Sequence, residues 1–268
     1  NDSDMIDDIV IDSKWCEDLW DRALVYEGHL LKTGAPRCDV LYGDRTDYQK
    51  AFREKYHLPE NAKAVMYAPT FREGAKNGKR FVFSEIWSVD FKRLLTNLEK
   101  KFSGTWYLCV RVHPQLAPTF DDYSNPDVQD RIINVSKADD MYEILAGMDA
   151  YITDYSSACF EAGLTGMPVF LYADDTKKYE KDRGQLLWDL NSANRHDIAN
   201  NQKITPGMNL RLPFPLAATN EELEEDILEF DRNAYSKRLS DFYQGIGMIF
   251  KGDAASVLTR EILDRIHE

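Results

Sequence analysis

Short apolar runs alternate with longer amphipathic segments along the whole chain. The runs are rich in β-branched and aromatic residues, which is typical of buried strands. In the longer segments apolar residues recur every third or fourth position, as in helices with one buried face. Strands are expected at 8–11, 30–33, 64–68, 106–112, 131–135, 150–153 and 169–172. This alternation predicts an α/β fold with a doubly wound, Rossmann-like parallel sheet covered by helices on both faces.

Helices are expected between these strands, and polar residues mark where several of them begin. The expected helices lie at 13–26, 47–56, 89–102, 139–148, 157–164, 221–230, 233–245 and 253–267. The expected N-caps, including one for a shorter piece, are Ser13, Asp39, Asp139 and Asp253. The basic segment 74–80 is expected to be a loop, and 191–215 a long connection with a short strand near 208–212.

The stretch 150–184 carries the strongest functional signal. Its first strand ends at Thr153, and Asp154, Ser156 and Ser157 then interrupt the apolar pattern before a short helix and a second strand. A helix N-terminus with free N–H groups and nearby hydroxyls suits a phosphate. The alternative is that the two serines only cap the helix. Both interpretations stay open on these residues alone.

Polar residues also follow the other strands at their carboxyl ends, where parallel sheets bind ligands. They are Thr70, Arg72, His113, Ser136, Lys137, Asp174, Asp175, Tyr179, Asp182 and Arg183. A histidine, hydroxyls, cations and carboxylates beside a helix N-terminus predict a site for a phosphate-bearing ligand. We expect the His113 imidazole to reach the serine pair from the strand next to theirs.

Composition and missing motifs exclude several other classes. The net charge of −13 argues against a nucleic-acid-binding surface and against attachment of this chain to an anionic membrane by charge. The sequence has no bilayer-spanning apolar run, no signal peptide, no glycine-rich phosphate loop and no GxSxG motif. The four cysteines lack zinc spacing. Cys109 and Cys159 are expected to be reduced core residues, which fits a reducing cytosol.

Several motifs resemble those of one family, in the family's order. They are TGAPRCDVLY at 33–42, YAPTFRE at 67–73, VRVHPQ at 110–115, SKADDMYEILAGMDAYITDYSSACFEAGLTGMPVFLY at 136–172, YEKDRG at 179–184 and GDAAS at 252–256. These segments resemble the CDP-glycerol glycerophosphotransferases, which are the teichoic acid primases and polymerases of Gram-positive bacteria. ITDYSS followed by YEKDRG is the most specific part of the resemblance.

The resemblance implies the donor-binding half of a metal-independent transferase of the GT-B type. Residues 1–43 are then expected to be the tail of an N-terminal acceptor-side domain. Residues 44–252 would form the Rossmann-like domain that binds the CDP-polyol donor, and 253–268 a helix that packs back on the N-terminal part. The family's HGTP-type motif, with its proposed catalytic base, is absent from the sequence. The chain is therefore expected to be the donor-binding part of a longer enzyme.

The implied reaction transfers glycerol phosphate from CDP-glycerol to a hydroxyl of a lipid-linked or polymeric acceptor and releases CMP. His113 and Arg111 are assigned catalytic roles at the phosphates, with His113 stabilising the departing CMP. The donor phosphates are assigned to Thr70, Arg72, Thr153, Asp154, Ser156 and Ser157. Closure over the nucleotide is assigned to Tyr179, Asp182 and Arg183. The resemblance implies no metal, no other cofactor and no nucleic-acid partner.

Two alternatives remain for the function. A related transferase would use CDP-ribitol or a nucleotide sugar at the same sheet edge. A non-catalytic module would bind a nucleotide or a partner surface there. For the full-length enzyme the resemblance implies a cytoplasmic protein on the inner face of the cell membrane. Membrane contact would then be made only by the N-terminal part that precedes these residues.

Overall fold

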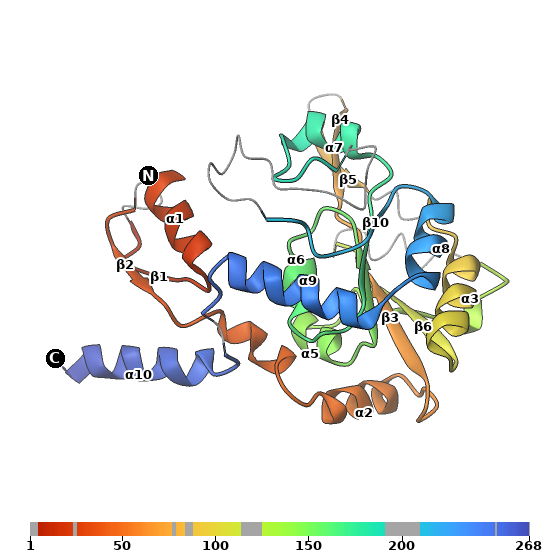
Figure 1. The fold of residues 1–268 in the computed structure, drawn as a ribbon, viewed down its shortest axis with the longest axis horizontal. Helices are drawn as coiled ribbons and strands as arrows, with labels where there is room; N and C mark the ends of the chain where they lie inside the picture. The colour runs from red at the N-terminus through yellow and green to blue at the C-terminus, as the bar shows by residue number, and fades with distance from the viewer. Residues whose placement is uncertain are drawn as a thin grey trace.

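A six-stranded parallel sheet forms the centre of the molecule (Figure 1). The computed structural model describes residues 5–23, 26–76, 79–83, 88–113, 125–190, 210–249 and 251–267. In spatial order the strands are β10 (Leu216–Ala217), β9 (Val169–Tyr172), β8 (Ala150–Thr153), β3 (Lys63–Tyr67), β6 (Trp106–Val110) and β7 (Ile132–Asn134). Every neighbouring pair is parallel. The predicted α/β fold is therefore confirmed.

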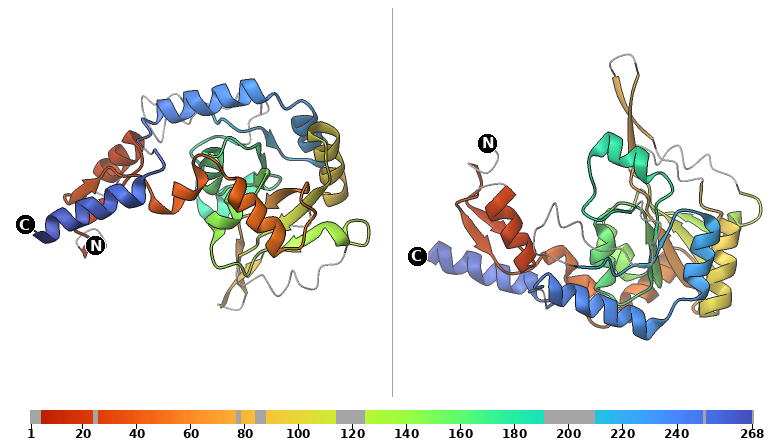
Figure 2. Two further views of the ribbon diagram at one scale, coloured as in Figure 1. Left: turned by 90° about the horizontal axis from the view of Figure 1, so that it is seen from below. Right: turned by 45° about the horizontal axis from the view of Figure 1, so that its top comes forward.

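Helices cover both faces of this sheet (Figures 1 and 2). On one face α3 (Phe91–Phe102) packs against α8 (Asn220–Leu228). The other face carries α5 (Met141–Ala146), α6 (Ala158–Gly163) and α9 (Arg232–Gly245). The helix α2 (Thr46–Lys55) packs beside α5. Because both faces are covered, all residues of β8 and β9 are buried, which explains why these strands are continuous apolar runs.

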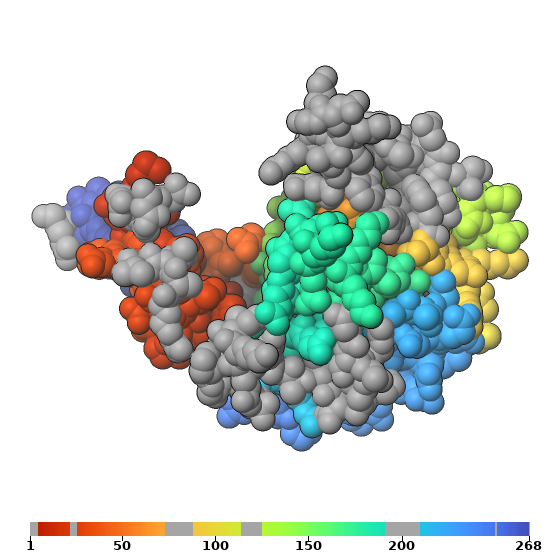
Figure 3. Space-filling view, turned by 90° about the horizontal axis from the view of Figure 1, so that it is seen from above, coloured from red at the N-terminus to blue at the C-terminus, as the bar shows by residue number. Residues whose placement is uncertain are grey.

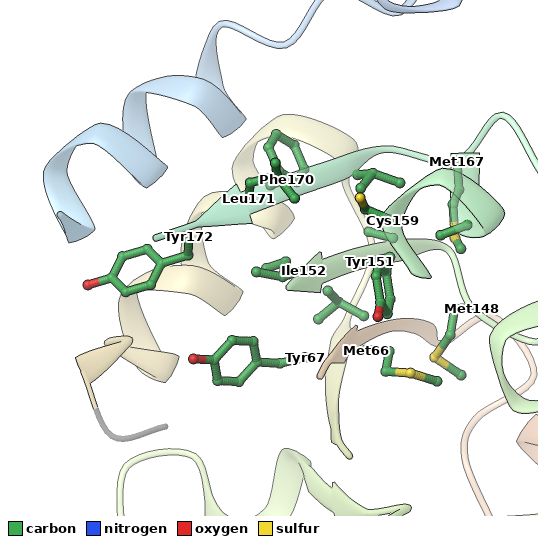
Figure 4. Close-up of a cluster of buried hydrophobic side chains, with 14 of the residues drawn as sticks. Met66, Tyr67, Met148, Tyr151, Ile152, Cys159, Met167, Phe170, Leu171 and Tyr172 are labelled. Atoms are coloured by element: carbon green, nitrogen blue, oxygen red, sulfur yellow. The ribbon is translucent and has the colours of Figure 1, made fainter. Parts of the chain in front are cut away.

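Large side chains fill the core on both sides of the central strands. Figure 4 shows Met66 of β3, Tyr151 of β8 and Phe170 of β9, each of which is fully buried. On the face covered by α3, Leu94 and Leu98 are buried at the spacing that the sequence predicts for this helix. Close packing leaves these strands little freedom to move. The loops at their carboxyl ends therefore rest on a rigid base.

A separate small unit precedes the main sheet. Strands β1 (Asp8–Val10) and β2 (His29–Leu31) are parallel, and α1 (Lys14–Ala23) connects them. Ser13 caps α1 as predicted, accepting a hydrogen bond of 3.2 Å from the backbone N–H of Cys16. A 3-10 helix, η2 (Pro36–Leu41), leads from this unit to α2. We call residues 5–41 the N-terminal unit.

The last helix, α10 (Ala254–His267), runs beside the N-terminal unit (Figures 1 and 2). Asp39 was expected to cap a short piece near it in sequence, but it caps α10. Its two carboxylate oxygens accept hydrogen bonds from the backbone N–H groups of Ala254 and Ala255 at 2.9 and 2.8 Å. The carboxylate of Asp39 thus makes the capping contacts that we expected of Asp253. Such a long-range cap cannot be recognised from local spacing.

Two further expectations about local structure are wrong. The helix expected to begin at Asp139 is capped by Asp140, whose carboxylate accepts hydrogen bonds from the backbone N–H groups of Tyr142 and Glu143. The basic segment after β3 is an antiparallel hairpin, β4 (Arg72–Lys76) and β5 (Lys79–Phe83), not a loop. An Asn-Gly pair lies between these strands in the sequence, and it is a strong hairpin signal that our reading did not use.

The strand expected near 208–212 also differs from the structure. The edge strand β10 lies a few residues later, and its register pairs Leu216 with Leu171. The part of the expected strand before residue 210 lies outside the described residues. A polar, proline-containing segment gives too weak a pattern to place so short a strand.

Candidate functional site

The loops after β3, β6, β8 and β9 gather at the carboxyl edge of the sheet, below helix α7 (Thr176–Arg183). Figure 3 shows α7 in teal on the face seen from above. Phe71, in the loop after β3, contacts His113 with ring centroids 4.6 Å apart. The guanidinium carbon of Arg183 lies 4.7 Å from the centroid of the same Phe71 ring. Two predicted site residues from distant parts of the chain thus meet at one aromatic side chain.

His113 does not come from the strand next to the serine pair, so this expectation is wrong. Strand β3 lies between β6, which leads to His113, and β8, which leads to Ser156 and Ser157. Both β6 and β8 pair with β3. Order within a parallel sheet depends on crossover connections, and these leave no local mark in the sequence. The loop after this intervening strand supplies Phe71.

The two serines at the start of α6 have different surroundings. The Ser156 hydroxyl accepts a hydrogen bond of 3.3 Å from the backbone N–H of Ala158, so it caps the helix. Ser157 makes no side-chain cap hydrogen bond and is exposed. The capping interpretation therefore fits Ser156. Ser157 instead presents its hydroxyl at a helix start, where N–H groups favour an anion.

Thr153 and Asp154 are buried and build the loop that holds the serines. Thr153 Oγ1 donates a hydrogen bond of 2.7 Å to the carbonyl of Ala68, which ties β8 to the end of β3. Asp154 accepts hydrogen bonds from the backbone N–H groups of Thr70 and Tyr155 at 2.8 and 2.7 Å. Phosphate contacts of these side chains are not among the observed interactions and stay a prediction.

Arg72 is 7% exposed and paired with two carboxylates. Its Nε and Nη2 atoms donate to the two oxygens of Asp175 at 2.9 and 2.8 Å, and Nη2 also donates to Asp154 at 3.0 Å. The guanidinium carbon lies 5.0 Å from the ring centroids of both Tyr155 and Tyr179. These two rings stack with centroids 4.0 Å apart. Arg72 is thus held by protein groups, and the phosphate contact that we predicted for it stays a prediction.

The carboxyl groups of this cluster have pKa values shifted in opposite directions. Burial raises the pKa of Asp154, and the charge of Arg72 opposes this shift. For Asp175, burial also favours the neutral form. Hydrogen bonds from Arg72 and Tyr155 outweigh it and lower the pKa of Asp175. Asp175 is therefore the carboxylate that holds Arg72 most firmly.

Arg111, at the end of β6, contacts protein carbonyls. Its Nη1 atom donates to the carbonyl oxygens of Val135 and Ala138 at 2.9 and 3.2 Å. Burial lowers the pKa of this guanidinium group. These bonds join the end of β6 to the loop after β7, and so they support the segment that carries His113. A catalytic role for Arg111 itself stays a prediction.

Two of the three residues expected to close over a nucleotide contact the strand ends. Tyr179 stacks on Tyr155, and Arg183 stacks on Phe71. Asp182 is exposed on α7. Helix α7 ends at Gly184, whose φ of +99° is disfavoured for residues with a side chain. Closure of this helix over a ligand stays a prediction.

Two cavities open beside Ser157. The larger, of about 320 Å³, lies between the N-terminal unit and helices α6 and α9, and aromatic side chains are prominent in its lining. These include Trp15, Phe160, Trp188 and Phe242. The smaller, of about 200 Å³, lies between the serine loop and residues 186–190. Because Ser157 lines both cavities, a ligand bound at the start of α6 can extend into either one.

A polar cluster that our sequence analysis did not single out borders the larger cavity. Arg37 donates from Nε to the Tyr142 hydroxyl at 2.7 Å and from Nη2 to Glu161 at 2.9 Å. Tyr142 also donates to Glu161 at 2.7 Å. Burial and this hydrogen bond raise the pKa of Tyr142. All three residues lie inside the motifs of the family resemblance, as do Phe71 and Tyr155. Membership in these motifs was therefore the signal by which the sequence could have identified them.

Other features of the described residues concern metals, membranes and thiols. No group of three or more His, Cys, Asp or Glu side chains in this part of the chain could hold a metal ion. None of the helices described is long and apolar enough to cross a membrane. The four cysteines are free, and Cys109 and Cys159 are buried, as predicted.

The chain belongs to the CDP-glycerol:poly(glycerophosphate) glycerophosphotransferase family, whose model matches residues 1–204. A teichoic acid poly(glycerol phosphate) polymerase of Staphylococcus epidermidis is 28% identical over 237 residues, covering 87% of this chain and 29% of that protein. A teichoic acid glycerol-phosphate transferase of Staphylococcus aureus is 25% identical, covering 87% of this chain and 54% of that protein.

A solved structure shares the fold over nearly the whole chain. The wall teichoic acid polymerase TagF superposes with a TM-score of 0.72 at 25% sequence identity, covering 99% of this chain and 59% of that one. This similarity supports the GT-B-type, Rossmann-like arrangement described above. The chain therefore spans from less than a third to about three fifths of the length of these relatives.

Proposed function

We propose that this chain binds the CDP-glycerol donor of a glycerophosphotransferase that builds teichoic acid. The observation that carries the proposal is that Ser157 follows a strand end at the same edge of the sheet where His113 and Arg183 both contact Phe71. The family match supports the donor, and one structure of a TagF variant was obtained after a soak with CDPG. The two cavities beside Ser157 offer space for the rest of the nucleotide.

In the proposed reaction an acceptor oxygen forms a bond to the β-phosphorus of CDP-glycerol. The bond between this phosphorus and the bridging oxygen breaks, and CMP leaves with the electron pair. Ser157 and the N–H groups at the start of α6 would bind phosphoryl oxygens, where negative charge builds in the transition state. A protonated His113 would stabilise the departing CMP. The base that takes the acceptor proton is not assigned to this chain, because the sequence lacks the HGTP-type motif.

We also propose the domain division given by the resemblance. Residues 44–252 would form the donor-binding domain, 1–43 the tail of an acceptor-side domain, and 253–268 a helix returning to it. Among the described residues, large exposed apolar side chains gather on the N-terminal unit and α10: Met5, Ile6, Leu19, Ile262, Leu263 and Ile266. Such a patch is typical of a surface that another domain covers.

The acceptor and the location belong to the proposed whole enzyme. The acceptor would be a growing polymer, as the name of one relative suggests, or a lipid-linked primer, as the family resemblance implies. The enzyme would act in the cytoplasm on the inner face of the cell membrane. Contact with the membrane would come from a part other than these residues, which carry a net negative charge.

Thermal melting with a panel of nucleotides tests this proposal. CDP-glycerol and CMP are expected to stabilise the chain, by about 2.7 kcal/mol at a concentration one hundred times the dissociation constant. Ser157→Ala is expected to weaken this protection without lowering the melting temperature of the unliganded chain, whereas Ser256→Ala, on α10, serves as the matched control. Stronger protection by CDP-ribitol or a UDP-sugar would show that this nucleotide, rather than CDP-glycerol, is the donor. A folded chain that none of these nucleotides protects would contradict the proposal.

A further inference from the structure

Arg72 is buried at the sheet edge and makes several polar contacts there. It begins β4, directly after the loop that leaves β3. Its two partners come from different strand ends: Asp154 follows β8, and Asp175 follows β9 and precedes α7. The three strands are neighbours in the order β9, β8, β3. One buried guanidinium therefore joins three consecutive strand ends.

The geometry of these contacts leaves little of the guanidinium for a ligand. Asp175 is bound through two parallel hydrogen bonds, Asp154 through one, and the Thr70 carbonyl accepts another. The side chain of Arg72 is 8% exposed, and those of Asp154 and Asp175 are 5% and 11% exposed. One cation against two carboxylates leaves a formal charge of −1 in this group. The group therefore has no excess positive charge to offer a donor phosphate.

The same guanidinium also orders two aromatic side chains. Tyr155 belongs to the serine loop and Tyr179 to α7, and Arg72 lies 5.0 Å from the ring centroid of each. The Tyr155 hydroxyl donates to Asp175 at 2.8 Å. A planar, delocalised cation can stack on rings and bind a carboxylate with two hydrogen bonds at once, which an ammonium group cannot do.

We propose that Arg72 is a positioning residue, which locks the serine loop and α7 together so that Ser157 and Arg183 are placed before the donor arrives. This inference rests on the proposed function, because it concerns the same sheet edge. It differs from a direct phosphate contact in what it requires of Arg72. Positioning needs both carboxylates as partners of the planar fork, whereas a phosphate contact needs guanidinium N–H groups that are free to reach the ligand.

Three variants of the 268-residue chain separate these two roles through their affinity for CMP in calorimetric titration. Arg72→Lys keeps the charge, and Asp175→Asn keeps Arg72 while removing a competing carboxylate. A positioning role predicts that each of these two variants weakens CMP binding by about tenfold or more. A tenfold loss of affinity corresponds to about 1.4 kcal/mol of binding free energy. A direct phosphate contact predicts instead that Asp175→Asn binds CMP equally well or better, because a carboxylate that competes for Arg72 is removed. Arg131→Lys, which disturbs an ion pair with Glu99 before β7, is the control and should bind as the wild type does.

Hydrogen exchange of the unliganded chain provides a readout that does not depend on nucleotide. Arg72→Lys is expected to speed amide exchange in residues 154–160 and in α7, while Arg131→Lys leaves both segments unchanged. Unchanged exchange there, or CMP affinity within twofold of the wild type in both Arg72→Lys and Asp175→Asn, would overturn the positioning role. A wild-type chain that binds no CMP would contradict the proposed function instead, while exchange still decides whether Arg72 locks the two segments.

Discussion

Single side chains at the sheet edge divide into those that are buried and those that are at least partly exposed. Thr153, Asp154 and Arg72 are buried, and their polar atoms are engaged by neighbouring loops. Ser157 is exposed, and His113 is partly exposed beside Phe71. Residues of the first group set the shape of the site. We propose that those of the second group contact the ligand.

His113→Ala is expected to weaken CMP binding by about tenfold to a hundredfold. The physical reason is the loss of a hydrogen bond to a charged phosphate, which contributes about 1.5–3 kcal/mol. Cytidine, which lacks the phosphate, should bind to the variant and the wild type equally well. Titration calorimetry measures both affinities, with His29→Ala on β2 as the matched control. Equal losses for CMP and cytidine would show that His113 does not act on the phosphate.

Helices and strands carry the site through contacts that are distant in the sequence. The start of α6 presents Ser157, α7 presents Arg183, and the loop after β3 supplies Phe71, which contacts both Arg183 and His113. Helix α10 is fixed at its start by Asp39, a residue from the opposite end of the chain. The cap therefore couples the N-terminal unit to the last helix.

Asp39→Ala is expected to destabilise the chain by about 1–2 kcal/mol, the usual effect of removing a helix cap. Two backbone N–H groups at the start of α10 lose their acceptor in this variant. Chemical denaturation measures the change, and Asp253→Ala is the control because Asp253 was the cap expected from the sequence. A larger loss for Asp253→Ala than for Asp39→Ala would contradict the assignment.

Local pattern was enough to predict most elements but not their neighbours in space. The helix that begins after Asp90 and the strands β3, β8 and β9 followed from apolar spacing alone. The position of β3 between β6 and β8 could not be predicted in this way, because the apolar pattern of a strand does not depend on which strand it pairs with. For the same reason the sequence could not reveal that Arg72 binds two carboxylates, since both are more than 80 residues away.

The described residues form a broad sheet with its helices and a small N-terminal unit, whose η2 packs against α5, α6 and α10 (Figure 1). The larger cavity lies between them, and Cys16 of α1 lines it. Cys38 of η2 also lines this cavity but is buried, and Cys109 and Cys159 are buried in the core of the sheet. The reactivity of Cys16 can therefore report on the cavity, and that of Cys109 and Cys159 on the core.

Cys16 is expected to be the first thiol that maleimide modifies in the folded chain. Burial raises the pKa of Cys38 to about 12 and raises those of Cys109 and Cys159 further, so these thiols are hardly ionised at neutral pH. Mass spectrometry of labelled peptides, with and without denaturant, measures the order. Cys16→Ser should remove the native-state label, and rapid native labelling of Cys109 would contradict this packing.

A crystal of this chain soaked with CDP-glycerol would show where the donor binds. We predict that the diphosphate lies within hydrogen-bonding distance of the Ser157 hydroxyl and the first N–H groups of α6, with the His113 imidazole on the same side and Arg72 still bound to its two carboxylates. A nucleotide bound away from this edge, or a diphosphate held by Arg72 in place of Asp175, would contradict it.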